Sequence, residues 1–109
     1  MKDIIKNLLT KKIILKKVEQ FDLSQLGTRK KILLFDGVDT ASNYTAIFVI
    51  EKKSRFLQKD ALELENLYEK LVEYKGHNYK KKILIYKMPI CSKALKLLKE
   101  MRWIVIELS

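Results

Sequence analysis

The pattern of apolar and polar residues predicts alternating strands and helices along most of the chain. Residues 45–53, TAIFVIEKK, contain a run of five apolar side chains, which indicates a strand covered on both faces of a sheet. Residues 58–75 form the clearest predicted helix, because apolar residues recur there at spacings of three and four. Gly76 follows at the position where glycine commonly ends a helix.

Shorter apolar segments predict the remaining elements. Residues 12–20, KIILKKVEQ, fit neither the helical nor the strand period and stay ambiguous between the two. Ser92 is the predicted N-cap of the last helix. The further predicted strands are residues 31–35, 82–86 and 103–108, and the further predicted helices are residues 2–10 and 93–101.

This order of elements predicts an α/β fold. A strand, a short helix and a strand in succession form a parallel unit in most proteins. We therefore expect a sandwich in which helices flank both faces of a mixed sheet of four or five strands, with residues 45–51 and 103–108 as central strands. At 109 residues, with only three glycines and one proline, residues 1–109 are expected to form a single ordered domain.

The charge of the chain indicates which class of partner it binds. Lysine and arginine number 23 against 13 acidic residues, a formal net charge of +10, which favours a polyanion such as nucleic acid. The alternative is a generally lysine-rich composition. The single cysteine, Cys91, excludes an internal disulfide. No apolar run is long enough to span a membrane and no signal-peptide pattern is present, so we expect a cytoplasmic protein.

Three charged residues end the long apolar strand and are the candidates for chemistry. Alternation along a strand places Glu51 and Lys53 on one face and Lys52 on the other. A carboxylate can ligate a divalent cation, and a neighbouring lysine can hold a water or a phosphate. Such a site needs a second acid. The simpler interpretation is that the strand leaves the core and its last residues are solvated.

Asp36 is the favoured second acid. Residues that face each other in an antiparallel hairpin have a constant sum of numbers, so Asp36 opposite Glu51 places the hairpin centre between Asn43 and Tyr44. The residues SNY are prone to turn there. The pairing would bring two carboxylates together at the end of the strand.

Two other hairpins remain open. If Asp39 faced Glu51, the centre would move to Thr45, a poorer turn position. If the whole of 36–43 were loop, Asp36 would lie roughly 20 Å from Glu51 and could not share a metal ion with it.

Asp36, the segment IEKKSR and the helix, strand, helix and strand that follow resemble the PD-(D/E)XK nuclease superfamily. The segment VIEKKSR is most similar to archaeal Holliday junction resolvases and their viral and plasmid relatives. The resemblance implies a restriction-endonuclease-like fold and phosphodiester hydrolysis that depends on Mg²⁺ or Mn²⁺. It also implies that Asp36, Glu51 and the carbonyl of Lys52 bind the metal ion, and that Lys53 positions the attacking water.

We therefore predict a metal-dependent DNA endonuclease, homodimeric and selective for junction or branched DNA. The alternative is a non-catalytic nucleic-acid-binding protein of the same fold, and a third candidate is a small interaction module whose charge is incidental. The residues expected to contact the phosphate backbone are Arg55, Lys75, Lys80, Lys81 and Lys82. His77 has no neighbouring cysteine or second histidine, so a zinc role is not expected.

Overall fold

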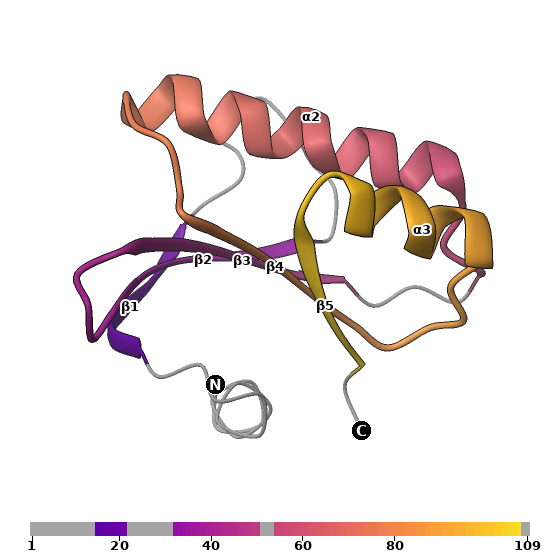
Figure 1. Ribbon diagram of the computed structural model, residues 1–109, viewed down its shortest axis with the longest axis horizontal. Coiled ribbons are helices and arrows are strands. Elements are labelled where there is room, and N and C mark those ends of the chain that lie inside the picture. Colours follow the sequence, from indigo (N-terminus) through magenta and orange to yellow (C-terminus); the bar gives the residue numbers. More distant parts are fainter. Residues whose placement is uncertain (1–14, 22–31, 51–53, 108–109) are drawn as a thin grey trace.

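A five-stranded sheet with two helices forms the framework of the protein (Figure 1). The computed structural model describes residues 15–21, 32–50 and 54–107. The strands are β1 (Leu15–Phe21), β2 (Ile32–Asp39), β3 (Tyr44–Ile50), β4 (Lys81–Tyr86) and β5 (Trp103–Glu107), and the helices are α2 (Gln58–Lys75) and α3 (Ser92–Glu100).

The central strand is β3, in a sheet with the order β1-β2-β3-β4-β5. Ala46 and Phe48 pack with the helices on one face, whereas Ile47 and Val49 belong to a second apolar cluster on the other face. All four side chains are buried. A strand whose side chains alternate between two dry faces suits the middle of a sheet, so the predicted central position is confirmed. Residues 51–53 of the predicted strand lie outside the described residues.

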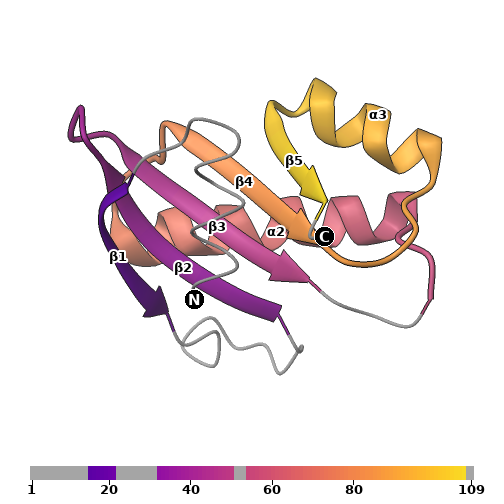
Figure 2. The same ribbon diagram turned by 90° about the horizontal axis from the view of Figure 1, so that it is seen from below.

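The sheet is mixed, as predicted. β1 and β2 extend it in antiparallel order on one side of β3, and β4 and β5 extend it in parallel order on the other side (Figure 2). The ambiguous segment at residues 12–20 contributes to β1. Helices α2 and α3 connect β3 to β4 and β4 to β5, so the predicted strand–helix–strand unit at the end of the chain is present and α2 joins a second parallel pair.

The predicted central position of residues 103–108 is wrong, because β5 is an edge strand: it is the last strand in the order of the sheet. Trp103 is nevertheless buried against Phe48 on the helix side, with ring centroids 5.5 Å apart. Ile106 is buried in the opposite cluster. The apolar sequence of β5 therefore reflects burial above and below the sheet, which says nothing about its lateral position.

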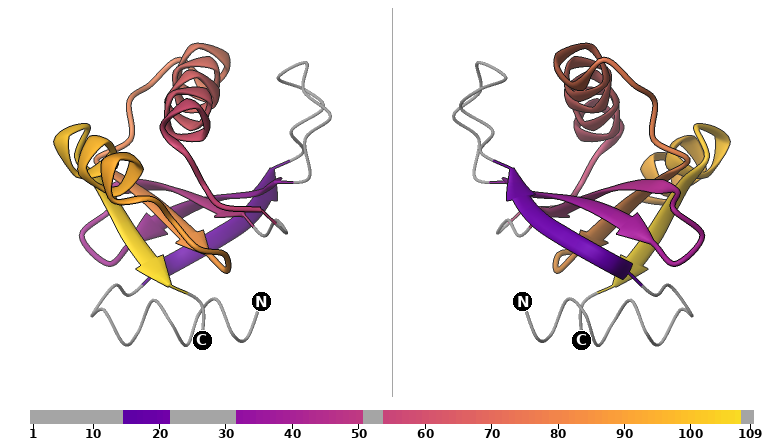
Figure 3. Two further views of the ribbon diagram at one scale, coloured as in Figure 1. Left: turned by 90° about the vertical axis from the view of Figure 1, so that its right-hand side faces the viewer. Right: turned by 90° about the vertical axis from the view of Figure 1, so that its left-hand side faces the viewer.

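Both described helices cover the same face of the sheet (Figure 3). The predicted helix at residues 2–10 lies outside the described residues, so helices on both faces remain a prediction. Within the described ranges, no helix is both long enough and apolar enough to cross a membrane.

The helix ends follow local chemistry. α2 ends at Gly76, whose φ of 75° is the left-handed conformation that a helix C-cap requires, as predicted. α3 starts one residue earlier than predicted, and its N-cap is Cys91 in place of Ser92. The Cys91 Sγ accepts a hydrogen bond of 3.3 Å from the Ala94 N–H.

Candidate nucleic-acid interface

The β2–β3 hairpin decides which side chains can share a site. Its register pairs Ile32 with Ile50 and Asp36 with Ala46. The predicted pairing of Asp36 with Glu51 is therefore wrong, because Asp36 lies opposite Ala46, five residues before Glu51. At about 3.3 Å per residue, the position opposite Asp36 on β3 lies roughly 13 Å before Ile50.

The turn that follows β2 explains this register. The Oδ1 atom of Asp39 accepts hydrogen bonds from the N–H groups of Ala41 (2.9 Å) and Asn43 (2.8 Å). The Ser42 N–H donates to the Asp39 carbonyl at 3.0 Å, and Ser42 has a φ of 66°. These contacts close a tight turn directly after Asp39, so the strand continues past Asp36. The alternative in which the whole of 36–43 is loop is therefore also wrong.

Asp39 does not lie at the end of β3 that precedes Glu51 either. Its side chain is buried at the turn, 3.5 Å from the Lys81 Nζ. The hydrogen bond from the Asn43 N–H is the main cause that lowers the pKa of Asp39, against the opposing effect of burial. Asp39 is thus an ionised acid that stabilises the turn. The alternative in which Asp39, in place of Asp36, is the second acid of a metal site is not supported.

Asp36 is occupied by an ion pair at the same end of the sheet. Its Oδ2 atom lies 3.3 Å from the Nζ of Lys75, the last residue of α2. Lys75 also lies over the ring of Phe21, 5.1 Å from the centroid. Burial, followed by the Asp36 carboxylate, raises the pKa of Tyr79 above its usual value of 10.0. These contacts make Asp36 part of a structural cluster where β2 meets the end of α2.

The strand partners at the opposite, C-terminal end of β3 are apolar or aromatic. Ile32 and Leu33 of β2 are the partners of Ile50 and Val49, and Tyr86 of β4 is the second partner of Ile50. β2 therefore supplies no carboxylate beside the end of β3 within the residues that the structure describes.

Glu51, Lys52 and Lys53 lie outside the described residues, and their predicted roles remain predictions. In residues 15–21, 32–50 and 54–107, no three His, Cys, Asp or Glu side chains gather in a group that could hold a metal ion. The position of Asp36 does not fit a magnesium site shared with Glu51.

Phe56 is held at this C-terminal edge by the segment that precedes α3. Phe56 and Ile90 form a parallel bridge, with the Phe56 N–H donating to the Pro89 carbonyl at 2.8 Å. Arg55 directly precedes this bridge and is exposed. Both α2 and α3 begin at this edge of the sheet (Figure 1). The edge therefore presents Arg55 beside two helix starts, which together favour anionic groups.

The predicted phosphate contacts do not form a single patch. Lys80, Lys81 and Lys82 lie at the start of β4, whereas Arg55 lies beyond the end of β3. Because β3 and β4 are parallel and Thr45 pairs with Lys81, these groups lie at opposite ends of β3, which spans roughly 17 Å from Thr45 to Ile50 at about 3.3 Å per residue.

Lys82 is not available for DNA. Its side chain is only 13% exposed, and its Nζ donates to both carboxylate oxygens of Glu65, at 3.0 and 3.1 Å. The Trp103 Nε1–H donates to the same carboxylate at 2.7 Å, and the lysine lies over the rings of Tyr68 and Trp103. This network was not predicted from the sequence. Glu65 could have been noticed, since it lies four residues after Ala61 within the apolar stripe of its helix.

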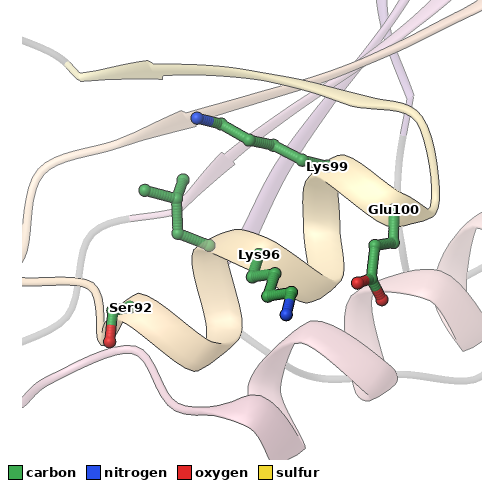
Figure 4. Close-up of a pocket in the computed structure, with 5 residues that line it drawn as sticks. Ser92, Lys96, Lys99 and Glu100 are labelled. Atoms are coloured by element: carbon green, nitrogen blue, oxygen red, sulfur yellow. The ribbon is translucent and has the colours of Figure 1, made fainter.

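A surface depression on α3 offers no better site. It is lined by residues of that helix alone, and Figure 4 shows Lys96 and Glu100, of opposite charge, on it beside Lys99. A single exposed helix face with mixed charge and no convergent polar groups lacks the features of a ligand pocket.

Comparison with known proteins extends the fold assignment. The sequence matches no known family model and no curated protein. The structure of EndoMS in its apo form is similar, with a TM-score of 0.58 and 22% identity over 89% of this chain. A repair endonuclease from Pyrococcus abyssi gives a TM-score of 0.57 at 18% identity over 97% of the chain. The EndoMS–dsDNA2 complex gives 0.56 at 18% identity over the whole chain.

This chain spans 38% to 43% of the length of these three structures. The predicted α/β fold with a mixed five-stranded sheet is confirmed, and it matches the fold of endonucleases.

Proposed function

We propose that this chain binds DNA through an endonuclease-like fold and does not hold a metal ion between Asp36 and Glu51. The observation that supports binding over cleavage is the register of the β2–β3 hairpin, in which Asp36 lies opposite Ala46. The net charge of +10 supports a polyanionic partner. Structural similarity to endonucleases, one of them in complex with dsDNA, supports DNA as that partner.

The proposed duplex-binding surface is the C-terminal edge of the sheet, where β3 and β4 end and both helices begin. Arg55 is exposed there beside the starts of both helices, and the sequence adds Lys52 and Lys53 directly after β3. Cations and helix N-termini position phosphates without reading bases, so we expect binding that is strong at low salt and indifferent to sequence.

Fluorescence anisotropy with a labelled duplex tests DNA binding. We expect the affinity to fall steeply as salt rises from about 50 to 200 mM, because bound phosphates release counterions. The variant Arg55→Ala should weaken duplex binding. Lys99→Ala, which removes an exposed cation near the end of α3, is the matched control and should not weaken it. Affinity that is absent, or unchanged by salt, would favour an interaction module whose charge is incidental.

Metal-dependent hydrolysis is the second candidate, because the similar structures are endonucleases and the segment IEKK directly follows the central strand. It would use Glu51 and Lys53 as catalytic residues and Mg²⁺ or Mn²⁺ bound by Glu51 and the Lys52 carbonyl, with an acid other than Asp36.

Incubation of labelled linear, branched and single-stranded DNA with Mg²⁺ or Mn²⁺ separates the two candidates. Binding without cleavage of any substrate is the expected result. If cleavage occurs, Glu51→Gln and Lys53→Ala should abolish or reduce it, whereas Asp36→Asn should leave it unchanged. Loss of cleavage in Asp36→Asn would instead restore Asp36 to the site.

Preference for branched DNA and a homodimeric state are part of the proposal. The same substrates, compared for affinity without metal, test the preference for branched DNA. Light scattering during gel filtration, with and without DNA, tests the dimer.

A further inference from the structure

A pair of stacked rings, one exposed and one half-buried, lies at the N-terminal end of β3, opposite the proposed duplex-binding edge. The rings of Tyr44 and His77 are 4.1 Å apart at an angle of 29°. Tyr44 remains 47% exposed, although it begins the central strand. A large aromatic ring held in contact with solvent is a feature that the folding of this sheet does not require.

The rings rest on a rigid support. Tyr79 is buried beside them, with its ring centroid 4.8 Å from that of His77 and 6.2 Å from that of Tyr44. The Tyr68 hydroxyl accepts from the Tyr79 N–H at 3.2 Å and is 3.3 Å from the Tyr79 carbonyl. The Lys80 N–H donates to the Tyr44 carbonyl at 2.9 Å. A pre-formed surface of this kind loses little conformational entropy when a ligand binds.

Positive charge accompanies the rings. Lys80 is exposed directly beside Tyr44 and has no ion-pair partner among the described residues. The two acids of β2 at this end are already paired, Asp36 with Lys75 and Asp39 with Lys81. An approaching phosphate would therefore meet an unneutralised lysine next to an aromatic surface.

We propose that Tyr44 and His77 form a platform that stacks an unpaired base of single-stranded nucleic acid, with Lys80 near the adjacent phosphate. Aromatic rings next to a basic group are the elements by which proteins bind single strands without sequence preference. Bases in a duplex are already stacked on each other, so an exposed ring at this end of the sheet selects unpaired ones. The inference rests on the proposed function only in that both concern nucleic acid; the surfaces are separate.

The test compares Tyr44→Ala with the wild type, using a fluorescein-labelled oligo(dT) of about ten nucleotides and an abasic oligomer of equal length. Loss of a base–aromatic stack should weaken oligo(dT) binding by roughly 5- to 100-fold. Binding of the abasic oligomer, which has the same phosphates and no bases, should not change. Tyr44→Phe should bind like the wild type. Tyr74→Ala, which removes an exposed tyrosine packed on Phe21, is the matched control.

Oligo(rU) in parallel with oligo(dT) distinguishes RNA from DNA as the source of the unpaired base. If Tyr44→Ala does not fold, NMR of the wild type replaces it, since the His77 ring protons should shift when oligo(dT) is added. Equal oligo(dT) binding by Tyr44→Ala, an equal loss on the abasic oligomer, or unshifted ring protons would overturn the proposal. Duplex binding that persists in Tyr44→Ala and falls in Arg55→Ala would separate this surface from the proposed duplex-binding edge.

Discussion

The two ends of β3 differ in what the neighbouring strands place beside them. At the C-terminal end, where the sequence continues into Glu51, the partners on β2 and β4 are Ile32 and Tyr86. At the N-terminal end, Asp36 and Asp39 of β2 are ion-paired with lysines. The acids expected at one end of the strand therefore lie towards the other.

This difference shows what a short motif can and cannot specify. The segment IEKK marks where an apolar strand acquires charge, which is a local property of the sequence. A metal site also needs a carboxylate from a second strand, and that depends on hairpin register. A shift of a few residues moves the second acid by more than the span of any ion's ligands, since each residue adds about 3.3 Å.

The largest expected effect comes from the network near the N-terminal end of β4. Glu65→Ala removes the acceptor for both Lys82 and Trp103 and leaves a mostly buried ammonium unpaired. We expect a loss of about 3 kcal/mol in the free energy of unfolding, the range for breaking a buried pair. Urea denaturation followed by circular dichroism measures it.

Glu69→Ala, which removes an exposed glutamate one turn later on the same helix, is the control and should change stability by less than about 0.5 kcal/mol. The pair Glu65→Leu and Lys82→Met, made together, should recover most of the loss because no charge is then left buried. Equal stability of Glu65→Ala and Glu69→Ala would show that the network contributes nothing.

The turn at Asp39 should make stability depend on acid pH. Because the pKa of Asp39 in the folded protein lies below its usual 3.8, the ionised form is favoured by folding. This stabilisation is fully present above pH 3.8 and is lost as pH falls through the lower folded value. Asparagine does not titrate, so the difference in melting temperature between wild type and Asp39→Asn should shrink below about pH 4. A difference that is constant from pH 7 to pH 2 would contradict the role of the ionised carboxylate.

A smaller effect is expected from the ion pair that holds Asp36. Asp36→Asn should cost about 0.5 to 1 kcal/mol of stability, because the pair with Lys75 is partly exposed. A double-mutant cycle with Lys75→Met should show coupling of similar size, measured by urea denaturation at low and high salt. A variant with unchanged stability and no coupling would mean that the pair is not formed in solution.

The elements were predictable from sequence to the extent that they depend on local pattern. Residues 58–75 show the helical period and end at Gly76, and the structure places the helix there. The strand predicted at residues 31–35 is too short, because the Asp39 side chain closes the turn and residues 36–39, DGVD, pair in the sheet. The lateral position of β5 was not predictable, because an apolar end strand covered on both faces has the same pattern as a central one.

The candidate site was less predictable than the fold, because it depends on contacts between distant elements. Glu65 and Lys82 are 17 residues apart, and no local pattern joins them. Tyr44 and His77 are even further apart in the sequence, and each alone resembles an ordinary surface residue. The sequence identified which residues could do chemistry, but the register of strands and the end of α2 determined which of them meet.

The smallest expected effect tests the apolar end of β3 directly. Leu33 is the partner of Val49 and is 46% exposed, so an aspartate can replace it without being buried. If the missing component of a metal site is an acid on β2, Leu33→Asp should bind Mn²⁺ more tightly than the wild type, as charged oxygen ligands accumulate near Glu51. Isothermal titration calorimetry measures the affinity for Mn²⁺. Combining Glu51→Gln with Leu33→Asp should cancel the gain in affinity. Leu62→Asp, which places the same charge at an exposed leucine of α2, should bind no better than the wild type. Equal gains in the two aspartate variants would mean that added charge alone attracts the ion, and that the two ends of β3 differ less than the register indicates.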